Sequence, residues 1–394
     1  MMPVEKSEDE YAQALTAYEA GSLEQARRSA QSILRKNPRH VPALILAGVA
    51  AAQLLELDAA IEAFDRALAI QPDNPRAQFN KAGVLLLQGD WARGLPLYES
   101  RWRFAERPTH GTVAPERTPW RGRESLAGKR ILLRCEQGMG DTLQFCRYAP
   151  LVAERGASVV LETPRPLVSL LADLPGLTRL VVQGATPPPC DYECPLLSLP
   201  LAFGTTPASI PQATPYLTSD AGKVAEWRAR LGVATGWRIG LAWRGNALHA
   251  HDRRRSVPLQ RLLEHLPGEH QYVSLQKEPS AEETRLLREH PWIVDRTGEL
   301  HDFSDTAALC ACLDLVISVD TSVAHVAAGL GRPTWILLPY SPGWRWLLGR
   351  EDSPWYRCVV LLRQTRVDDW SDVCARLAGR LAEFPQSPQS GSAG

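Results

Sequence analysis

The sequence predicts α-helical repeats followed by an α/β region of two lobes, each built on a parallel sheet. Three observations support this fold class. The first hundred residues are rich in Ala, Leu, Glu, Gln and Arg, and they repeat with a fixed period. From about residue 129, short apolar runs alternate with helix-length segments. A proline-rich stretch at 187–215 then separates these runs into two groups.

The bulk composition limits the kinds of partner to expect. A chain of 394 residues is too long for one ordinary core and suits two or three domains. Lys plus Arg and Asp plus Glu both total 44, so the formal net charge is zero. Because no long-range field would attract nucleic acid or an anionic membrane, we expect partners to be recognised locally.

The N-terminal region repeats every 34 residues, the period of the helix-turn-helix tetratricopeptide unit. The second copy is the clearest, and a third, starting at Pro75, loses the pattern by Trp102. Stacked helix pairs of this kind form a curved surface that usually holds a peptide or protein. We therefore expect residues 1–104 to bind a protein or peptide partner, with a spacer or dimerisation element as the alternative. The residues in register are Ala26 and Ala60, Ala30 and Phe64, Ile33 and Ala67, and Pro38 and Pro72.

The rest of the chain divides by composition. Residues 105–128 have no apolar period and contain scattered prolines, glycines and charges, which indicates a linker. Continuous apolar runs then predict about three strands in an N-terminal lobe at 129–218 and at least four in a C-terminal lobe at 219–384. We expect a hinge near residues 215–237, and the composition of residues 385–394 is typical of a disordered tail. The apolar runs are KRILLRC, ASVVLET and TRLVVQ, then RIGLAWRG, QYVSLQ, LDLVISVD and PTWILLPY.

Eight cysteines in so long a chain indicate small buried side chains in a reducing compartment. Neither Cys190 with Cys194 nor Cys310 with Cys312 has a second Cys or His pair at zinc spacing, so we expect no metal. The N-terminus does not resemble a signal peptide, and no run approaches the 18 apolar residues that span a bilayer. A cytoplasmic protein without integral membrane association is expected.

The first candidate motif follows the run KRILLRC. It consists of a turn containing Gly138 and Gly140 and then Asp141 at the start of a helix. A dinucleotide fingerprint would need a glycine where Leu143 stands, which disfavours a dinucleotide oxidoreductase. The remaining hypotheses are a general base at the mouth of the lobe and, favoured by spacing alone, a capping box formed by Asp141 with Gln144.

Two further motifs follow strands of the C-terminal lobe. After LDLVISV come hydroxyls and a histidine, and a helix N-terminus with hydroxyls suits a pyrophosphate. The alternative for this motif is an N-cap with a buried core histidine. After RIGLAW come an arginine, an asparagine and an Arg-rich loop, which fit phosphate recognition or, alternatively, a solvated basic loop. The candidate donor-binding residues are Asp320, Thr321, Ser322, His325, Asn246, Arg244, Arg254 and Arg255.

Eight short stretches in a fixed order resemble one known family. They are EQGMGDTLQFCRY, CPLLSLP, GLAWRGN, RRRSVPL, SLQ, DTAAL, LDLVISVDTSVAHVA and SPWY. The region from about Lys129 to Trp370 is similar to the glycosyltransferase domain of bacterial tetratricopeptide proteins. That domain is similar to glycosyltransferase family 9 (the heptosyltransferases) and more distantly to O-linked N-acetylglucosamine transferases. The resemblance implies a GT-B fold of two Rossmann-like lobes and an inverting, metal-independent transferase that uses a nucleotide-sugar co-substrate and no other cofactor.

The resemblance also assigns roles to residues. Asp141 aligns with the carboxylate that deprotonates the acceptor hydroxyl, in an acceptor loop with Gly138 and Gly140. The segment from Asp320 to His325 aligns with the part that holds the donor pyrophosphate. Arg254 or Arg255, and less closely Arg244, would replace the lysine that neutralises the leaving diphosphate. Gly343 stands where the family pattern has an Asp before the Trp, which leaves that loop without an assigned role.

These observations lead to a hypothesis of sugar transfer from a nucleoside diphosphate to a hydroxyl, with a protein on the repeats as the acceptor. A lipopolysaccharide or other glycan acceptor is the alternative within this class. A catalytically inactive scaffold that only binds a partner or a nucleotide is the alternative from another class.

Overall fold

The computed structural model describes residues 3–104, 117–212, 215–234, 236–245 and 252–384. Contacts divide the chain into two compact units. The first comprises Met1–Ala114, Phe203–Ser209 and Tyr340–Gly349, and the second comprises Pro115–Ala202, Ile210–Pro339 and Arg350–Gly394. The expected tail at 385–394 lies outside the described residues, as does the N-terminal half of the expected linker.

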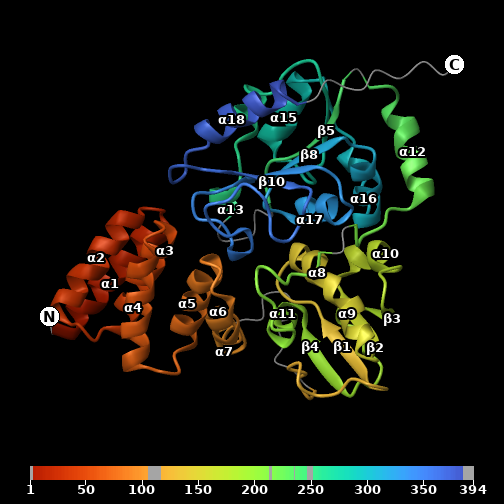
Figure 1. Ribbon diagram of the computed structural model, residues 1–394. Helices are drawn as coiled ribbons and strands as arrows, with labels where there is room; N and C mark the ends of the chain where they lie inside the picture. The colour runs from red at the N-terminus through yellow and green to blue at the C-terminus, as the bar shows by residue number, and fades with distance from the viewer. Residues whose placement is uncertain (1–2, 105–116, 213–214, 235, 246–251, 385–394) are drawn as a thin grey trace. The chain divides into compact units, whose positions relative to one another are not determined.

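The first unit is a series of helices in which each one packs on the next, from α1 to α6. The residues predicted to repeat every 34 positions lie in its interior: Ala26, Ala60, Phe64 and Ala67 are all fully buried. The prediction of helical repeats is therefore confirmed. The helices are α1 (Pro3–Glu19), α2 (Leu23–Lys36), α3 (Val41–Gln53), α4 (Leu57–Ile70), α5 (Pro75–Leu87), α6 (Trp91–Tyr98) and α7 (Arg101–Phe104) (Figure 1).

The close approach of α3 to α4 explains two positions of the repeat. A Cβ added to Gly48 would lie only 2.6 Å from Cε1 of Phe64, so a glycine is needed where the aromatic ring packs. At the start of α5, the Asn74 side chain accepts a hydrogen bond from the Ala77 amide at 3.0 Å, and Pro75 occupies the first turn. This asparagine and proline are typical helix-start signals.

The segment Tyr340–Gly349 clusters with the helical unit, although the sequence analysis placed it in the C-terminal lobe. The Trp344 ring makes edge-to-face contacts with Trp91 and Tyr98, at centroid distances of 5.5 and 6.1 Å. The Ser341 hydroxyl bonds the Ala52 carbonyl at 3.4 Å. Burial of a large aromatic ring, which no local sequence pattern reveals, accounts for this assignment.

The N-terminal lobe of the second unit has a parallel sheet with the order β3-β2-β1-β4. Its last strand, β4, lies in the proline-rich stretch, where the sequence predicted no strand. A proline is tolerated in this strand because Pro195 stands at its end. Part of the expected linker pairs with this strand, since Trp120 N and Glu193 N exchange bonds with Glu193 O and Thr118 O. The elements are β1 (Arg130–Arg134), α8 (Met139–Phe145), α9 (Ala149–Glu154), β2 (Ser158–Thr163), α10 (Val168–Leu171), β3 (Leu177–Val182), β4 (Tyr192–Pro195) and α11 (Leu199–Ala202).

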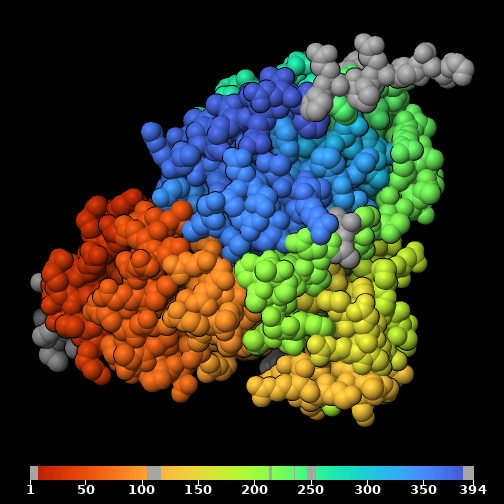
Figure 2. Space-filling view, viewed as in Figure 1, coloured from red at the N-terminus to blue at the C-terminus, as the bar shows by residue number. Residues whose placement is uncertain are grey.

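The C-terminal lobe has a six-stranded parallel sheet with the order β10-β9-β8-β5-β6-β7. Part of the expected Arg-rich loop forms a short helix, α13. Helix α12 lies at the surface (Figure 2). The elements are α12 (Ala221–Leu231), β5 (Arg238–Ala242), α13 (Asp252–Arg255), α14 (Leu259–Leu263), β6 (Gln271–Ser274), α15 (Ala281–Glu289), β7 (Ile293–Val294), α16 (Phe303–Ala311), β8 (Leu315–Val319), α17 (Ser322–Gly329), β9 (Thr334–Leu338), β10 (Val359–Arg363) and α18 (Ser371–Ala382).

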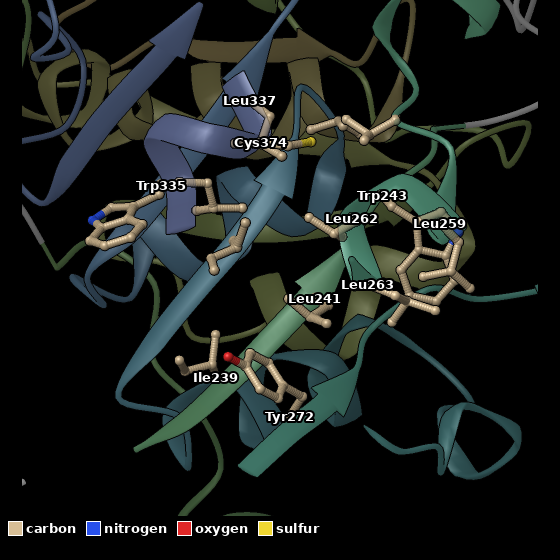
Figure 3. Packing of buried hydrophobic residues seen from close by; sticks show 14 of the residues in the cluster. Ile239, Leu241, Trp243, Leu259, Leu262, Leu263, Tyr272, Trp335, Leu337 and Cys374 are labelled. Atoms are coloured by element: carbon tan, nitrogen blue, oxygen red, sulfur yellow. The ribbon is translucent and has the colours of Figure 1, made fainter. Parts of the chain in front are cut away.

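A core of apolar side chains fixes this sheet. Ile239 and Leu241 lie on one face of β5, and Tyr272, Trp335 and Leu337 extend the cluster over other strands of the sheet (Figure 3). Because parallel strands are covered on both faces, their apolar runs are continuous, as the sequence predicted. Among the described helices, none combines the length and the apolarity needed to cross a bilayer.

Candidate active site

Both sheets change winding direction at one point, and ligands of open α/β sheets bind at such switch points, beyond the carboxyl ends of the strands. In the N-terminal lobe the switch lies between β1 and β4. The turn after β1 leads into α8, in which Asp141 occupies the third helical position. One oxygen of its carboxylate, Oδ2, accepts a hydrogen bond from the Gly138 amide at 2.8 Å. The carboxylate therefore caps α8 and is held at the switch point, but Gln144 takes no part in the cap.

In the C-terminal lobe the switch lies between β8 and β5. Asp320 follows β8, Thr321 is the N-cap position of α17, and Ser322 is its first helical residue. Thr321 makes no side-chain capping bond. Its hydroxyl is therefore not used as an N-cap, and the first amides of any helix have no acceptor within that helix.

Helices α8 and α17 pack against each other, so the two switch points adjoin (Figure 1). The contact centres on Gly140, where an added Cβ would lie 2.9 Å from Cδ2 of His325 and 3.6 Å from Cα of Ser322. A side chain at position 140 would push the histidine away. The glycine thus brings the backbone beside Asp141 against the N-terminal turn of α17, one turn before His325.

Arg255 reaches the same strand end from α13. Its Nε donates to Oδ1 of Asp252 at 2.9 Å, and its NH1 donates to the Asp320 carbonyl at 3.1 Å. Asp252 is 5% exposed and also accepts a bond from the Ser256 hydroxyl at 3.1 Å. A side chain at Gly245 would overlap the Arg255 guanidinium. The carboxylate and the glycine therefore fix a cation beside the residue that precedes α17.

The other basic candidates differ from Arg255. Arg244 bonds both oxygens of Glu283 at 3.2 Å and the Glu278 carbonyl at 2.8 Å, so its charge is already paired. Burial opposes ionisation of Glu283, but bonds from Arg244, the Ser280 amide and Trp243 hold the pKa of this carboxyl below its usual range. Arg254 lies in α13, half-buried. Asn246 lies outside the described residues.

His325 is buried and bonded to a side chain from the loop before β10. Its Nδ1 lies 2.8 Å from the Tyr356 hydroxyl, and its Nε2 lies 3.9 Å from Oδ1 of Asp320. The Tyr356 hydroxyl also lies 3.3 Å from that of Tyr216. Burial raises the pKa of Tyr356 well above its usual value, so this phenol stays protonated at neutral pH.

Arg147 completes this buried network from the turn after α8. Its NH2 donates to the Tyr216 hydroxyl at 3.1 Å and its NH1 to the Trp355 carbonyl at 2.6 Å. The guanidinium lies over the rings of Tyr216 and Tyr356, 4.5 and 4.4 Å from their centroids. This arrangement joins α8 to the segment around Tyr356 and hence to His325.

A pocket of about 490 Å³ opens elsewhere along the same sheet edge. It is lined by residues that follow β6 and β7: Lys277, Glu278, Pro279, Thr297, Gly298, Leu300 and His301. In the strand order, β6 is two positions and β7 three positions from β8. At the usual strand spacing, the pocket is about 10–14 Å from the end of β8.

The cysteines and the other candidate ligands form no metal centre in the described part of the chain. No group of three or more His, Cys, Asp or Glu side chains there could hold an ion. The cysteines are thiols, most of them buried as expected, and burial raises the pKa of Cys146 and Cys310 to about 12.

Sequence reasoning did not single out Tyr356, Tyr216, Arg147 or Asp252. Tyr356 and Arg147 stand within the stretches SPWY and EQGMGDTLQFCRY, which carried the resemblance, but no spacing links them to His325. Asp252 precedes the Arg-rich run, and an acidic residue three positions before an arginine on a helix was the available signal.

Comparison with known proteins agrees with this architecture. The tetratricopeptide repeat family matches residues 11–75 and 56–109. Glycosyltransferase family 9 (heptosyltransferase) matches residues 269–342, which include β8 and all of α17.

Individual relatives share 29% or less of their aligned residues with this chain. Protein FlbA of Caulobacter vibrioides is 29% identical over 360 residues, which cover 84% of this chain and 60% of that protein. The chain thus spans 60% of the length of this relative. A glycosyl transferase family 9 structure from Veillonella parvula is 12% identical, with a TM-score of 0.49 over 66% of this chain and 98% of that one. The O-GlcNAc transferase of Thermobaculum terrenum is 14% identical, with a TM-score of 0.30 over 97% of this chain and 92% of that one. The chain is thus similar to tetratricopeptide repeats in its N-terminal region and to glycosyltransferase family 9 over residues 269–342.

Proposed function

We propose that the chain transfers a sugar from a nucleoside diphosphate to an acceptor hydroxyl, with inversion at the anomeric carbon and without a metal. The observation that carries this proposal is the contact of α8 with α17 at Gly140. This contact brings the part of α8 that carries the Asp141 carboxylate next to the N-terminus of α17. An inverting transfer needs these two groups on opposite sides of the reacting carbon.

In the proposed reaction, the carboxylate of Asp141 accepts the proton of the acceptor hydroxyl. The hydroxyl oxygen forms a bond to the anomeric carbon, and the bond from that carbon to the diphosphate oxygen breaks. Negative charge then builds on the leaving diphosphate. The first amides of α17, the hydroxyls of Thr321 and Ser322, and the fixed guanidinium of Arg255 stabilise that charge.

The pocket beyond β6 and β7 supports a nucleoside on the donor. It lies on the same edge of the sheet as the start of α17, about 10–14 Å away by strand spacing. A diphosphate at α17 would therefore extend its ribose and base along this edge. The proposal leaves Arg244 in a structural role, because it is bonded to Glu283 and to the Glu278 carbonyl rather than to the residue at the end of β8.

For the acceptor, we propose a protein held by the tetratricopeptide repeats. Repeats of this family usually bind peptides or proteins on a stacked helical surface. Such binding would raise the local concentration of the acceptor hydroxyl near the transferase domain.

A pair of variants tests the assignment of roles. Asp141→Asn should lower turnover on the order of a hundredfold or more, since general-base catalysis contributes at least that much, and should leave nucleotide affinity nearly intact. His325→Ala should weaken nucleotide affinity as well. Turnover would be followed by release of nucleoside diphosphate, and affinity by thermal shift with UDP, GDP, ADP, CMP and TDP conjugates.

Asp191→Asn provides a matched control, because Asp191 is an exposed carboxylate of the same lobe whose side chain is 43% exposed. It should keep the activity of the parent. Equal turnover of Asp141→Asn and the parent would remove Asp141 from the mechanism.

A further inference from the structure

The hydrogens around Tyr356 can be placed by counting donors. The Tyr216 hydroxyl has one hydrogen, and its bond to the Leu143 carbonyl at 2.9 Å uses it, because a carbonyl only accepts. Tyr216 meanwhile accepts from Arg147 at 3.1 Å. Tyr216 therefore has no hydrogen left for Tyr356.

Two acceptors near the Tyr356 hydroxyl differ in distance. The Tyr216 oxygen lies at 3.3 Å, beyond the usual range for a bond between hydroxyls, whereas Nδ1 of His325 lies at 2.8 Å. The shorter contact takes the Tyr356 hydrogen. Nδ1 of His325 is then an acceptor, and the ring hydrogen is on Nε2, the nitrogen nearer to Asp320.

The charges around the network act in the same direction. Arg147 is 4% exposed and, among the described residues, forms no ion pair with a carboxylate. Its positive charge lies over the ring of Tyr356, the residue bonded to His325. Repulsion from Arg147 disfavours a hydrogen on Nδ1, the nitrogen bonded to Tyr356, whereas the Asp320 carboxylate, 3.9 Å from Nε2, favours a hydrogen on Nε2.

We infer that Tyr356 is a positioning residue that holds His325 in the Nε2–H tautomer, so that the imidazole presents a hydrogen-bond donor toward the N-terminal turn of α17. This inference rests on the proposed function for what the donor serves, a diphosphate oxygen. The Tyr356 hydroxyl contacts the imidazole at Nδ1, not at Nε2. It orients the donor without contacting the ligand, as the hydrogen-bond partner of the other ring nitrogen does in other histidine sites.

The test reads the tautomer in the ligand-free protein. The chain, labelled with ¹⁵N at its nine histidines, is recorded by long-range ¹H–¹⁵N correlation, and the His325 signals are assigned with His325→Gln. We expect Nδ1 to have the shift of an unprotonated nitrogen and Nε2 that of a protonated one. In Tyr356→Phe, which keeps the ring over Arg147, both shifts should move toward a mixture of tautomers.

Tyr216→Phe is the matched control, because it removes a hydroxyl from the same network that is one bond further from His325. It should leave the His325 shifts as in the parent. A proton on Nδ1 in the parent, or identical His325 shifts in the parent and Tyr356→Phe, would overturn the inference. A change of the His325 shifts in Tyr216→Phe without a change in Tyr356→Phe would do the same.

A second measurement connects the tautomer to binding. Titration with ADP and UDP should show affinity reduced on the order of tenfold in Tyr356→Phe for whichever nucleotide the parent binds, and nearly unchanged affinity in Tyr216→Phe. Equal losses in both variants would contradict a specific positioning role. Absence of any nucleotide binding by the parent would contradict the proposed function alone, because the tautomer is read without ligand.

Discussion

Two arginines at the carboxyl edge of the second sheet carry the same charge but are held differently. Each is paired with a carboxylate, Arg255 with Asp252 and Arg244 with Glu283. The difference lies in position, because Arg255 also donates to the carbonyl of Asp320, the residue before Thr321 and α17, whereas Arg244 donates to the carbonyl of Glu278.

This difference predicts different effects of two alanine substitutions on nucleotide affinity. Arg255→Ala should reduce nucleotide affinity about tenfold to a hundredfold, the value of one charge-assisted hydrogen bond, and should also lower stability, because it leaves the buried Asp252 carboxylate without its guanidinium. Arg244→Ala should lower the free energy of unfolding by about 1–3 kcal/mol, because it leaves the half-buried Glu283 carboxylate without its guanidinium, and should leave nucleotide affinity nearly unchanged. Calorimetric titration and urea unfolding measure the two effects. A larger loss of affinity in Arg244→Ala than in Arg255→Ala would reverse the assignment.

At the residue scale, the sequence placed Asp141, Asp320, Thr321 and His325 after strands. The structure packs α8, which carries Asp141, against α17, which follows Asp320 and Thr321 and carries His325. The distinction between Arg244 and Arg255 could not be predicted, because it depends on Glu283 in α15 and on Asp252 in α13. Nor could the bond from Tyr356 to His325, whose partners are 31 positions apart in the chain.

At the scale of elements, the packing of α8 on α17 depends on one position without a side chain. Gly140→Ala would place a Cβ 2.9 Å from the buried His325 ring. Overpacking of this kind costs about 1–3 kcal/mol, and we expect nucleotide affinity to fall with stability because the histidine must move.

Gly83→Ala is the matched control for this substitution. Gly83 lies inside α5, and a Cβ added there meets no atom within 4 Å. Stability should rise by up to about 1 kcal/mol, as alanine is the better helix former. The comparison is made by thermal or urea unfolding, and unchanged stability of Gly140→Ala would show that α8 and α17 do not touch as described.

Periodicity predicted most elements because apolar burial is a local signal. It revealed the repeat helices, whose alanines and Phe64 are buried, and the continuous apolar strands of both sheets. It missed β4, whose proline-rich surroundings resemble a loop, and the short helix α13, whose residues are all charged.

At the scale of the molecule, the fold class of helical repeats followed by two parallel-sheet lobes could be predicted from the sequence. What could not be predicted is the membership of Tyr340–Gly349, which follows β9 in the chain but clusters with the helical unit. Its Trp344 packs against Trp91 and Tyr98, and no pattern within the segment encodes those distant rings.

We propose that this chain transfers a sugar from a nucleoside diphosphate, with Asp141, beside the N-terminus of α17, as the base. The most direct measurement is release of nucleoside diphosphate from a panel of nucleotide sugars by the parent chain and by Asp141→Asn. We predict slow release from at least one nucleotide sugar by the parent and release lower by about a hundredfold or more in the variant. No release by the parent from any sugar of the panel would contradict the claim and indicate a binding scaffold, and equal release by both chains would contradict the role of Asp141.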